Sequence, residues 1–99
     1  METKVIENGD GAEIVINGRL DTKTSKEAEA VFSEAGNKYD SVSLNMADVS
    51  YVSSAGIRAI RNLYMILYRK SGKLSVKNVG ENVMEVFEMT GLSGLLNIE

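Results

Sequence analysis

The sequence predicts a small α/β domain, a mixed β-sheet with three or four helices packed against it. The chain has 99 residues, the length of one domain, and we expect one unit over residues 1–99. Short stretches in which apolar and polar residues alternate take turns with stretches of helical periodicity. Helices between strands imply parallel crossovers, whereas two adjacent opening strands imply an antiparallel hairpin.

The strands are predicted from short runs of Val and Ile or from alternation of apolar and polar residues. Residues 4–7 and 13–17 are such Val and Ile runs, and the Asn-Gly-Asp-Gly stretch between them tolerates positive φ, which predicts a β-hairpin. Three later segments are also expected to be strands, the last of them short: residues 41–46, 74–79 and 95–98.

The helices are predicted from apolar spacing and from start and stop residues. Thr24 and Glu27 match a capping box at the start of the first helix, and Gly36 is expected to end it. The second helix is predicted over residues 54–70, closed by Ser71 and Gly72. A third helix over the Val83 region is expected to stop at Gly91.

The composition excludes several kinds of chemistry. The chain has no His and no Cys, so it lacks an imidazole base, a thiolate nucleophile, the usual zinc ligands and any disulfide. A net charge of −3 argues against general nucleic-acid binding. No apolar run approaches the length of a membrane span, and the N-terminus has no signal-peptide core. We therefore expect a cytoplasmic protein without membrane insertion, metal or cofactor.

The stretch before the second helix contains two adjacent serines. Either Ser53 or Ser54 suits a helix N-cap, and this structural role alone would explain both. Helix geometry nevertheless places Ser54 on the exposed side with Arg58 and Arg61, whereas Ser53 falls nearer the apolar side. A phosphate on Ser54 would meet free backbone amides and the positive end of the helix dipole.

Neighbouring residues allow both a binding and a structural interpretation. Met65 lies among the exposed arginines and suits an adaptable contact, although scattered apolar surface residues are common. Gly56 either lets a partner approach the backbone or allows the helix to pack tightly on the sheet. Asp21 and Asp48 are a conceivable carboxylate pair, but we expect turn roles, with Asp48 stabilising the loop before the second helix. Without a histidine to activate either serine, we expect no enzyme.

Three motifs resemble those of bacterial anti-sigma factor antagonists, the STAS domains. Gly18-Arg19-Leu20-Asp21 resembles the family's G-x-L-D stretch. Asp48-Val49-Ser50-Tyr51-Val52-Ser53-Ser54-Ala55-Gly56-Ile57 resembles its D-x-S-x-(hydrophobic)-(D/S)-S-x-G-(hydrophobic) segment. Phe87-Glu88-Met89-Thr90-Gly91-Leu92 resembles its F-x-x-(S/T)-G-L stretch. The three motifs occur in the family's order, and the resemblance covers essentially the whole chain.

The resemblance implies a phosphorylation cycle in place of catalysis. The serine at the position of Ser54 would be phosphorylated by an anti-sigma factor that is also a serine kinase, and a PP2C-type phosphatase would reverse the reaction. The unphosphorylated protein would bind the anti-sigma factor and so regulate sigma-factor-dependent transcription. Asp21 would contribute to the partner surface, which we expect to comprise Asp21, Ser53, Ser54, Gly56, Arg58, Arg61 and Met65. The alternative is a STAS-type scaffold in a lipid-transport or stress-signalling complex, without phosphorylation.

This sequence departs from the family pattern around the serine. Well-studied members have Asp at the position of Ser53 and often Ser or Thr at that of Ala55. Arg58 stands where a second glycine often follows. These departures leave Ser53 as a rival phosphorylation site and suggest a partner with a more acidic face.

Overall fold

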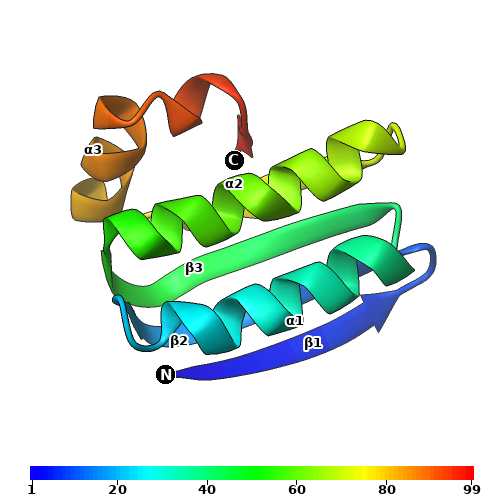
Figure 1. Cartoon of the computed structure of the whole chain (residues 1–99), viewed down its shortest axis with the longest axis horizontal. Coiled ribbons are helices and arrows are strands. Elements are labelled where there is room, and N and C mark those ends of the chain that lie inside the picture. The colour runs from blue at the N-terminus through cyan, green and yellow to red at the C-terminus, as the bar shows by residue number, and fades with distance from the viewer.

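Helices α1 and α2 lie side by side on one face of a five-stranded sheet (Figure 1). The computed structural model describes all residues, 1–99. The predicted order of strands and helices is confirmed, with a short 3-10 helix, η1, added before the last strand. The elements are β1 (Glu2–Asn8), β2 (Gly11–Leu20), α1 (Ser25–Lys38), β3 (Ser41–Val52), α2 (Ser54–Arg69), β4 (Lys73–Lys77), α3 (Glu81–Met89), η1 (Leu92–Gly94) and β5 (Asn97–Ile98).

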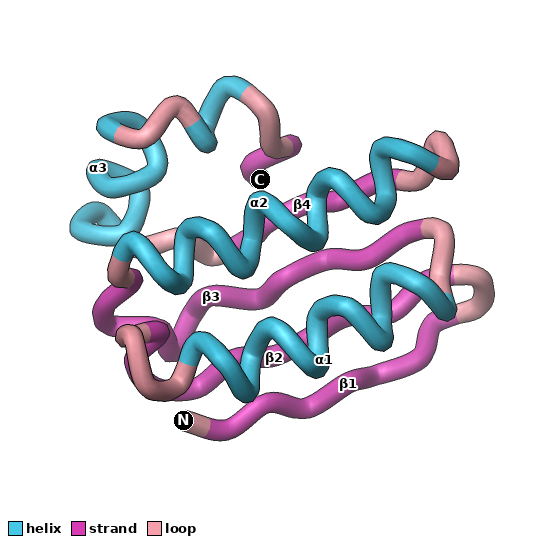
Figure 2. The backbone as a smooth tube through the Cα atoms, in the orientation of Figure 1, coloured by secondary structure: helices cyan, strands magenta, loops and turns pink.

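The sheet follows chain order from β1 to β5, as the tube drawing shows (Figure 2). Strands β1 and β2 are antiparallel, and all later neighbours are parallel, as predicted. The hairpin turn needs only Gly9 and Asp10 between the paired residues Asn8 and Gly11. Gly9 has φ of 67°, which suits glycine at the first central position of a type II′ turn.

The core lies between the sheet and its helical layer. Ile14, Leu44 and Val76 stand next to one another across β2, β3 and β4 and are completely buried. The alternate positions Glu13 and Lys77 point to the uncovered face, where their side chains form an ion pair of 2.6 Å. The period-two pattern of the strands therefore reflects a sheet covered on one face only.

The start of α1 corrects the predicted capping box. Thr24 has helical dihedral angles and makes no side-chain cap. Instead, Asp21 Oδ1 accepts from the N–H of Thr24 at 2.9 Å, and Thr24 Oγ1 accepts from the N–H of Asp21 at 3.0 Å. The reciprocal pair is thus Asp21 with Thr24. The prediction that Thr24 pairs with Glu27 is wrong, because the carboxylate of Asp21, three residues before Thr24, takes the place of Glu27.

Gly36 does not end α1, which continues to Lys38. Gly36 is buried against α2, where a Cβ atom would lie 2.9 Å from Leu63 Cδ1 and 3.1 Å from Ile66 Cγ2. The absence of a side chain therefore serves the contact between the two helices. The predicted stop of α3 is confirmed, since this helix ends at Met89, before Gly91, which has φ of 77°.

Strand β3 is twice as long as predicted and continues to Val52. Its pairing with β2 shifts register twice, after Asn45 and after Val49, and each shift gives β3 one extra residue. These bulges interrupt the alternation of apolar and polar residues after residue 46, so the sequence alone predicts a loop there. Asp48 consequently lies in the strand and not in a loop before the helix.

Candidate functional site

Ser53 is the N-cap of α2. Its Oγ accepts from the backbone N–H of Gly56 at 3.2 Å, and its carbonyl accepts from the N–H of Ile57 at 2.9 Å. Its own N–H donates to the carbonyl of Leu20 at 2.7 Å, which ties the helix start to the end of β2. The hydroxyl of Ser53 is therefore engaged in holding the helix end.

Ser54 is the first residue of α2 and is exposed. Its hydroxyl makes no hydrogen bond within the chain, in contrast to that of Ser53. The first turn of α2 contains no acidic side chain, so no negative charge of the helix itself offsets its positive end. The exposed hydroxyl thus stands where added negative charge would be stabilised.

A surface hollow of about 370 Å³ opens beside this hydroxyl. Arg61 crosses it, and its Nη2 donates to the carbonyl of Thr90 at 3.3 Å, which connects α2 to the end of α3. Sequence reasoning did not assign Thr90 to the site, although it lies in the F-x-x-T-G-L motif. The residues lining the hollow are Ser54, Ile57, Arg58, Arg61 and Thr90.

Asp21 lies in the turn whose neighbour Leu20 is bonded to Ser53. The backbone N–H of Thr24, together with its hydroxyl and the N–H of Lys23, holds the pKa of the Asp21 carboxyl below its usual range. Asp21 is therefore charged and fixed by its own turn. The structure brings it to the same end of the molecule as the two serines.

The remaining predicted residues lie in different environments. Gly56 is buried, and a Cβ there would lie 2.9 Å from the Leu20 carbonyl oxygen and from Val52 Cγ1, so tight packing accounts for this glycine. Arg58 is exposed beside Ser54, and Met65 is 38% exposed on the same side of α2, beyond Arg61 and outside the hollow.

A second exposed pair adjoins the helix start and was missed by sequence reasoning. The guanidinium of Arg19 lies 4.4 Å from the centre of the Tyr51 ring, a cation–π contact between β2 and β3. Tyr51 is 42% exposed and comes two residues before Ser53. Both residues occur within the motifs, but only the strand pairing shows that they touch.

The chemistry of this surface is that of charge and hydrogen bonding. No group of three or more acidic side chains is arranged to hold a metal ion. None of the helices has the length and apolar character required to cross a membrane. The exposed hydroxyl, the two arginines and the free helix end form a surface suited to an anion or an acidic partner.

Comparisons of the sequence and of the fold with known proteins agree on one family. The STAS domain family matches residues 3–99. An anti-sigma-B factor antagonist of Staphylococcus epidermidis is 27% identical over 99 residues, which are 99% of this chain and 92% of the relative. An anti-sigma-factor antagonist (STAS) domain protein from Planctomyces limnophilus shares the fold with a TM-score of 0.88 at 14% identity, over 98% of this chain and 87% of that one. The phosphorylated form of the Bacillus cell fate determinant SpoIIAA gives 0.78 at 18% identity, over 99% and 91%. Because the family match spans nearly the whole sequence, this chain belongs to the STAS domain family.

Proposed function

We propose that this chain is an anti-sigma factor antagonist controlled by phosphorylation of Ser54. The unphosphorylated protein binds an anti-sigma factor that is also a serine kinase, and this binding regulates sigma-factor-dependent transcription. The observation that carries the proposal is the division between the serines: Ser53 caps α2, whereas Ser54 is exposed beside Arg58 and Arg61. The curated relative named an anti-sigma-B factor antagonist supports the class of partner.

The physical basis of the switch is a local change of charge. A phosphate on Ser54 carries about −1.5 to −2 charges, which the helix end and Arg58 accommodate without disturbing the fold. In the complex the same phosphate enters a surface that fits an uncharged hydroxyl. An unpaired charge in an interface costs several kcal/mol, and each 1.4 kcal/mol weakens affinity about tenfold.

The partners supply the catalytic groups that the chain lacks. The kinase transfers phosphate from ATP to Ser54, and a PP2C-type phosphatase removes it again. The chain acts as substrate and binding protein in the cytoplasm, with Asp21, Arg58, Arg61 and Met65 extending the contact surface. Ser53 remains outside the phosphorylation step because its hydroxyl is held by the N–H of Gly56.

The test uses the purified chain together with an anti-sigma factor of the same organism that has serine kinase activity. With ATP, intact mass spectrometry should show one added phosphate on the wild type and on Ser53→Ala, and none on Ser54→Ala. In calorimetry, Ser54→Asp should weaken binding more than ~100-fold, while Ser54→Ala binds like the unphosphorylated wild type. Ser71→Asp, an exposed serine beyond the other end of α2, is the matched charge control and should bind normally.

Three outcomes would contradict the proposal. Equal affinity of wild type and Ser54→Asp for the partner would remove the switch. Absence of a phosphorylated product, with tight binding retained, would favour the scaffold role described for the alternative. A phosphate found on Ser53 would move the switch to the capping residue.

A further inference from the structure

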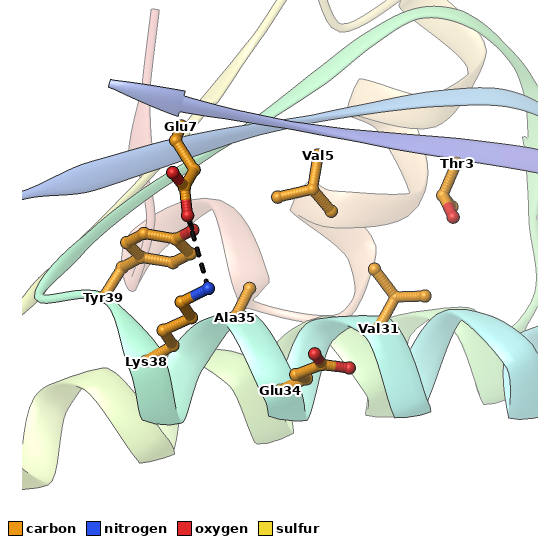
Figure 3. A pocket seen from close by; sticks show the side chains of 8 residues that line it. All are labelled: Thr3, Val5, Glu7, Val31, Glu34, Ala35, Lys38 and Tyr39. Atoms are coloured by element: carbon orange, nitrogen blue, oxygen red, sulfur yellow. Dashed lines mark hydrogen bonds and ion pairs between the residues drawn. The ribbon is translucent and has the colours of Figure 1, made fainter. Parts of the chain in front are cut away.

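A groove of about 390 Å³ runs between the edge strand β1 and helix α1, on the side of α1 away from α2 (Figure 3). Val5, Val31 and Ala35 form its apolar part, and Val5 is 43% exposed. Glu7 closes one end by contacts with Tyr39 and with Lys38 Nζ, which lies 3.3 Å from its carboxylate. The groove thus has an apolar middle and a neutralised end.

The backbone of β1 has unpaired groups along the same side of the strand. In the hairpin, Asn8 and Gly11 flank the two-residue turn and form a hydrogen-bonded pair. Hydrogen-bonded and non-bonded pairs alternate in antiparallel strands, so the N–H and C=O groups of Thr3, Val5 and Glu7 point away from β2. The side chains of these three residues line the groove, so free backbone groups and apolar surface coincide.

Neither a bulge nor a proline protects this edge, and its charged side chains are Glu2, Lys4 and Glu7. Strand β1 is seven residues long and pairs with β2 without a register shift, and the chain contains no proline. By contrast, the opposite edge strand β5 has only two residues. A long, regular, partly apolar edge without a bulge or proline is the kind that adds another strand.

We propose that β1 pairs with β1 of a second copy of this chain, which joins the two sheets into one of ten strands. A two-fold axis at Val5 sets Val5 opposite Val5 and Thr3 opposite Glu7, and it pairs all seven residues of β1. On the uncovered face it sets Lys4 opposite Ile6, whose apolar surface the lysine stem covers.

Charge and the number of paired residues favour this register over those with the two-fold axis one residue away. An axis moved by one residue to Lys4 places two like charges directly opposite, which is destabilising. An axis moved to Ile6 pairs only residues 4–8 and sets Val5 opposite Glu7. The register centred on Val5 keeps every charged residue of β1 opposite a neutral one, and it brings both copies of Val5 into the groove region.

The proposed pairing leaves the Ser54 surface free. Helix α1 lies between the new contact at β1 and helix α2, so each copy presents its own serine. The dimer is therefore compatible with the proposed function and does not depend on it.

A single cysteine tests the register directly, because the chain has none of its own. In Val5→Cys the two Cα atoms would lie about 5.5 Å apart, within disulfide range. Thr3→Cys is the matched control on the same strand and face. In the proposed register its two cysteines are four residues apart along the strand, or about 13 Å. Under mild oxidation Val5→Cys should form a covalent dimer at least tenfold faster than Thr3→Cys.

Sedimentation equilibrium of the unmodified chain supplies the second measurement. Its mass should rise with concentration from 10.8 kDa toward twice that value. Val5→Lys, which sets two ammonium groups opposite, should stay monomeric with an unchanged circular dichroism spectrum. A wild type that stays monomeric up to about 1 mM, or equal cross-linking of the two cysteine variants, would overturn the proposal. Phosphorylation of Ser54, measured in the Val5→Lys variant, tests the proposed function independently of dimer formation.

Discussion

At the start of α2, two neighbouring serines differ in what their hydroxyl groups contact. The Oγ of Ser53 accepts from Gly56, whereas that of Ser54 faces solvent beside two arginines. The helical wheel predicted the exposed side correctly, because Arg58 and Arg61 follow the serine at helical spacing. It could not predict the contact of Arg61 with Thr90, since 29 residues separate them in sequence. The exposed and buried sides of one helix are thus predictable, but its neighbours are not.

The first prediction concerns the cap. Ser53→Ala leaves the N–H of Gly56 without its acceptor and should lower the free energy of unfolding by about 0.5–2 kcal/mol. Ser54→Ala removes a hydroxyl that makes no contact within the chain and should change it by less than about 0.5 kcal/mol. Urea denaturation of both variants measures the difference. Equal losses in the two variants would show that the capping assignment is wrong.

At the level of elements, packing and hydrogen bonding override local sequence signals. Helix α1 begins under the control of Asp21, and Gly36 lies within it because α2 packs closely there. Strand β3 contains two register shifts that conceal its length. The order and type of the elements follow from periodicity, whereas these boundaries depend on contacts between elements that are distant in sequence.

Gly56 provides a prediction at this level. Gly56→Ala would press a methyl group against the backbone oxygen of Leu20 and the side chain of Val52, each 2.9 Å away. Overpacking of this kind costs about 1–3 kcal/mol, which exceeds the gain of about 1 kcal/mol from replacing a helical glycine. We therefore expect a lower thermal midpoint. Gly94→Ala, where a Cβ meets nothing within 4 Å, is the matched control and should be nearly neutral.

For the whole molecule, charged contacts join elements along the sheet. The Tyr39 hydroxyl, with Lys38, lowers the pKa of Glu7, and the Lys77 ammonium, with Asn45, lowers the pKa of Glu13. The pKa of Asp21 is also lowered, by the N–H of Thr24. All three carboxylates bind protons less readily in the folded chain than in the unfolded chain. Their contribution to stability is therefore present above the unfolded pKa values of about 3.9–4.3 and is lost at lower pH.

Acid titration tests this coupling. The urea midpoint should be nearly constant above about pH 6 and should fall as the pH drops from about 5 toward 3, while the folded carboxylates become protonated. Glu13→Gln removes one of the three groups and should flatten the decline relative to the wild type. Glu2→Gln, an exposed glutamate on β1 that makes no ion pair, is the control and should leave the slope unchanged. A midpoint independent of pH would contradict the assignment.

The order of the strands has a consequence for how the chain acquires its structure. Every strand pairs with the next one along the sequence, so no strand must be inserted between two that are already joined. The hairpin of β1 and β2 closes the shortest loop, and each later strand adds at one growing edge after its crossover helix. Synthesis in the N- to C-terminal direction therefore delivers the strands in the order in which they lie in the sheet, with the two-residue strand β5 as the last of the five.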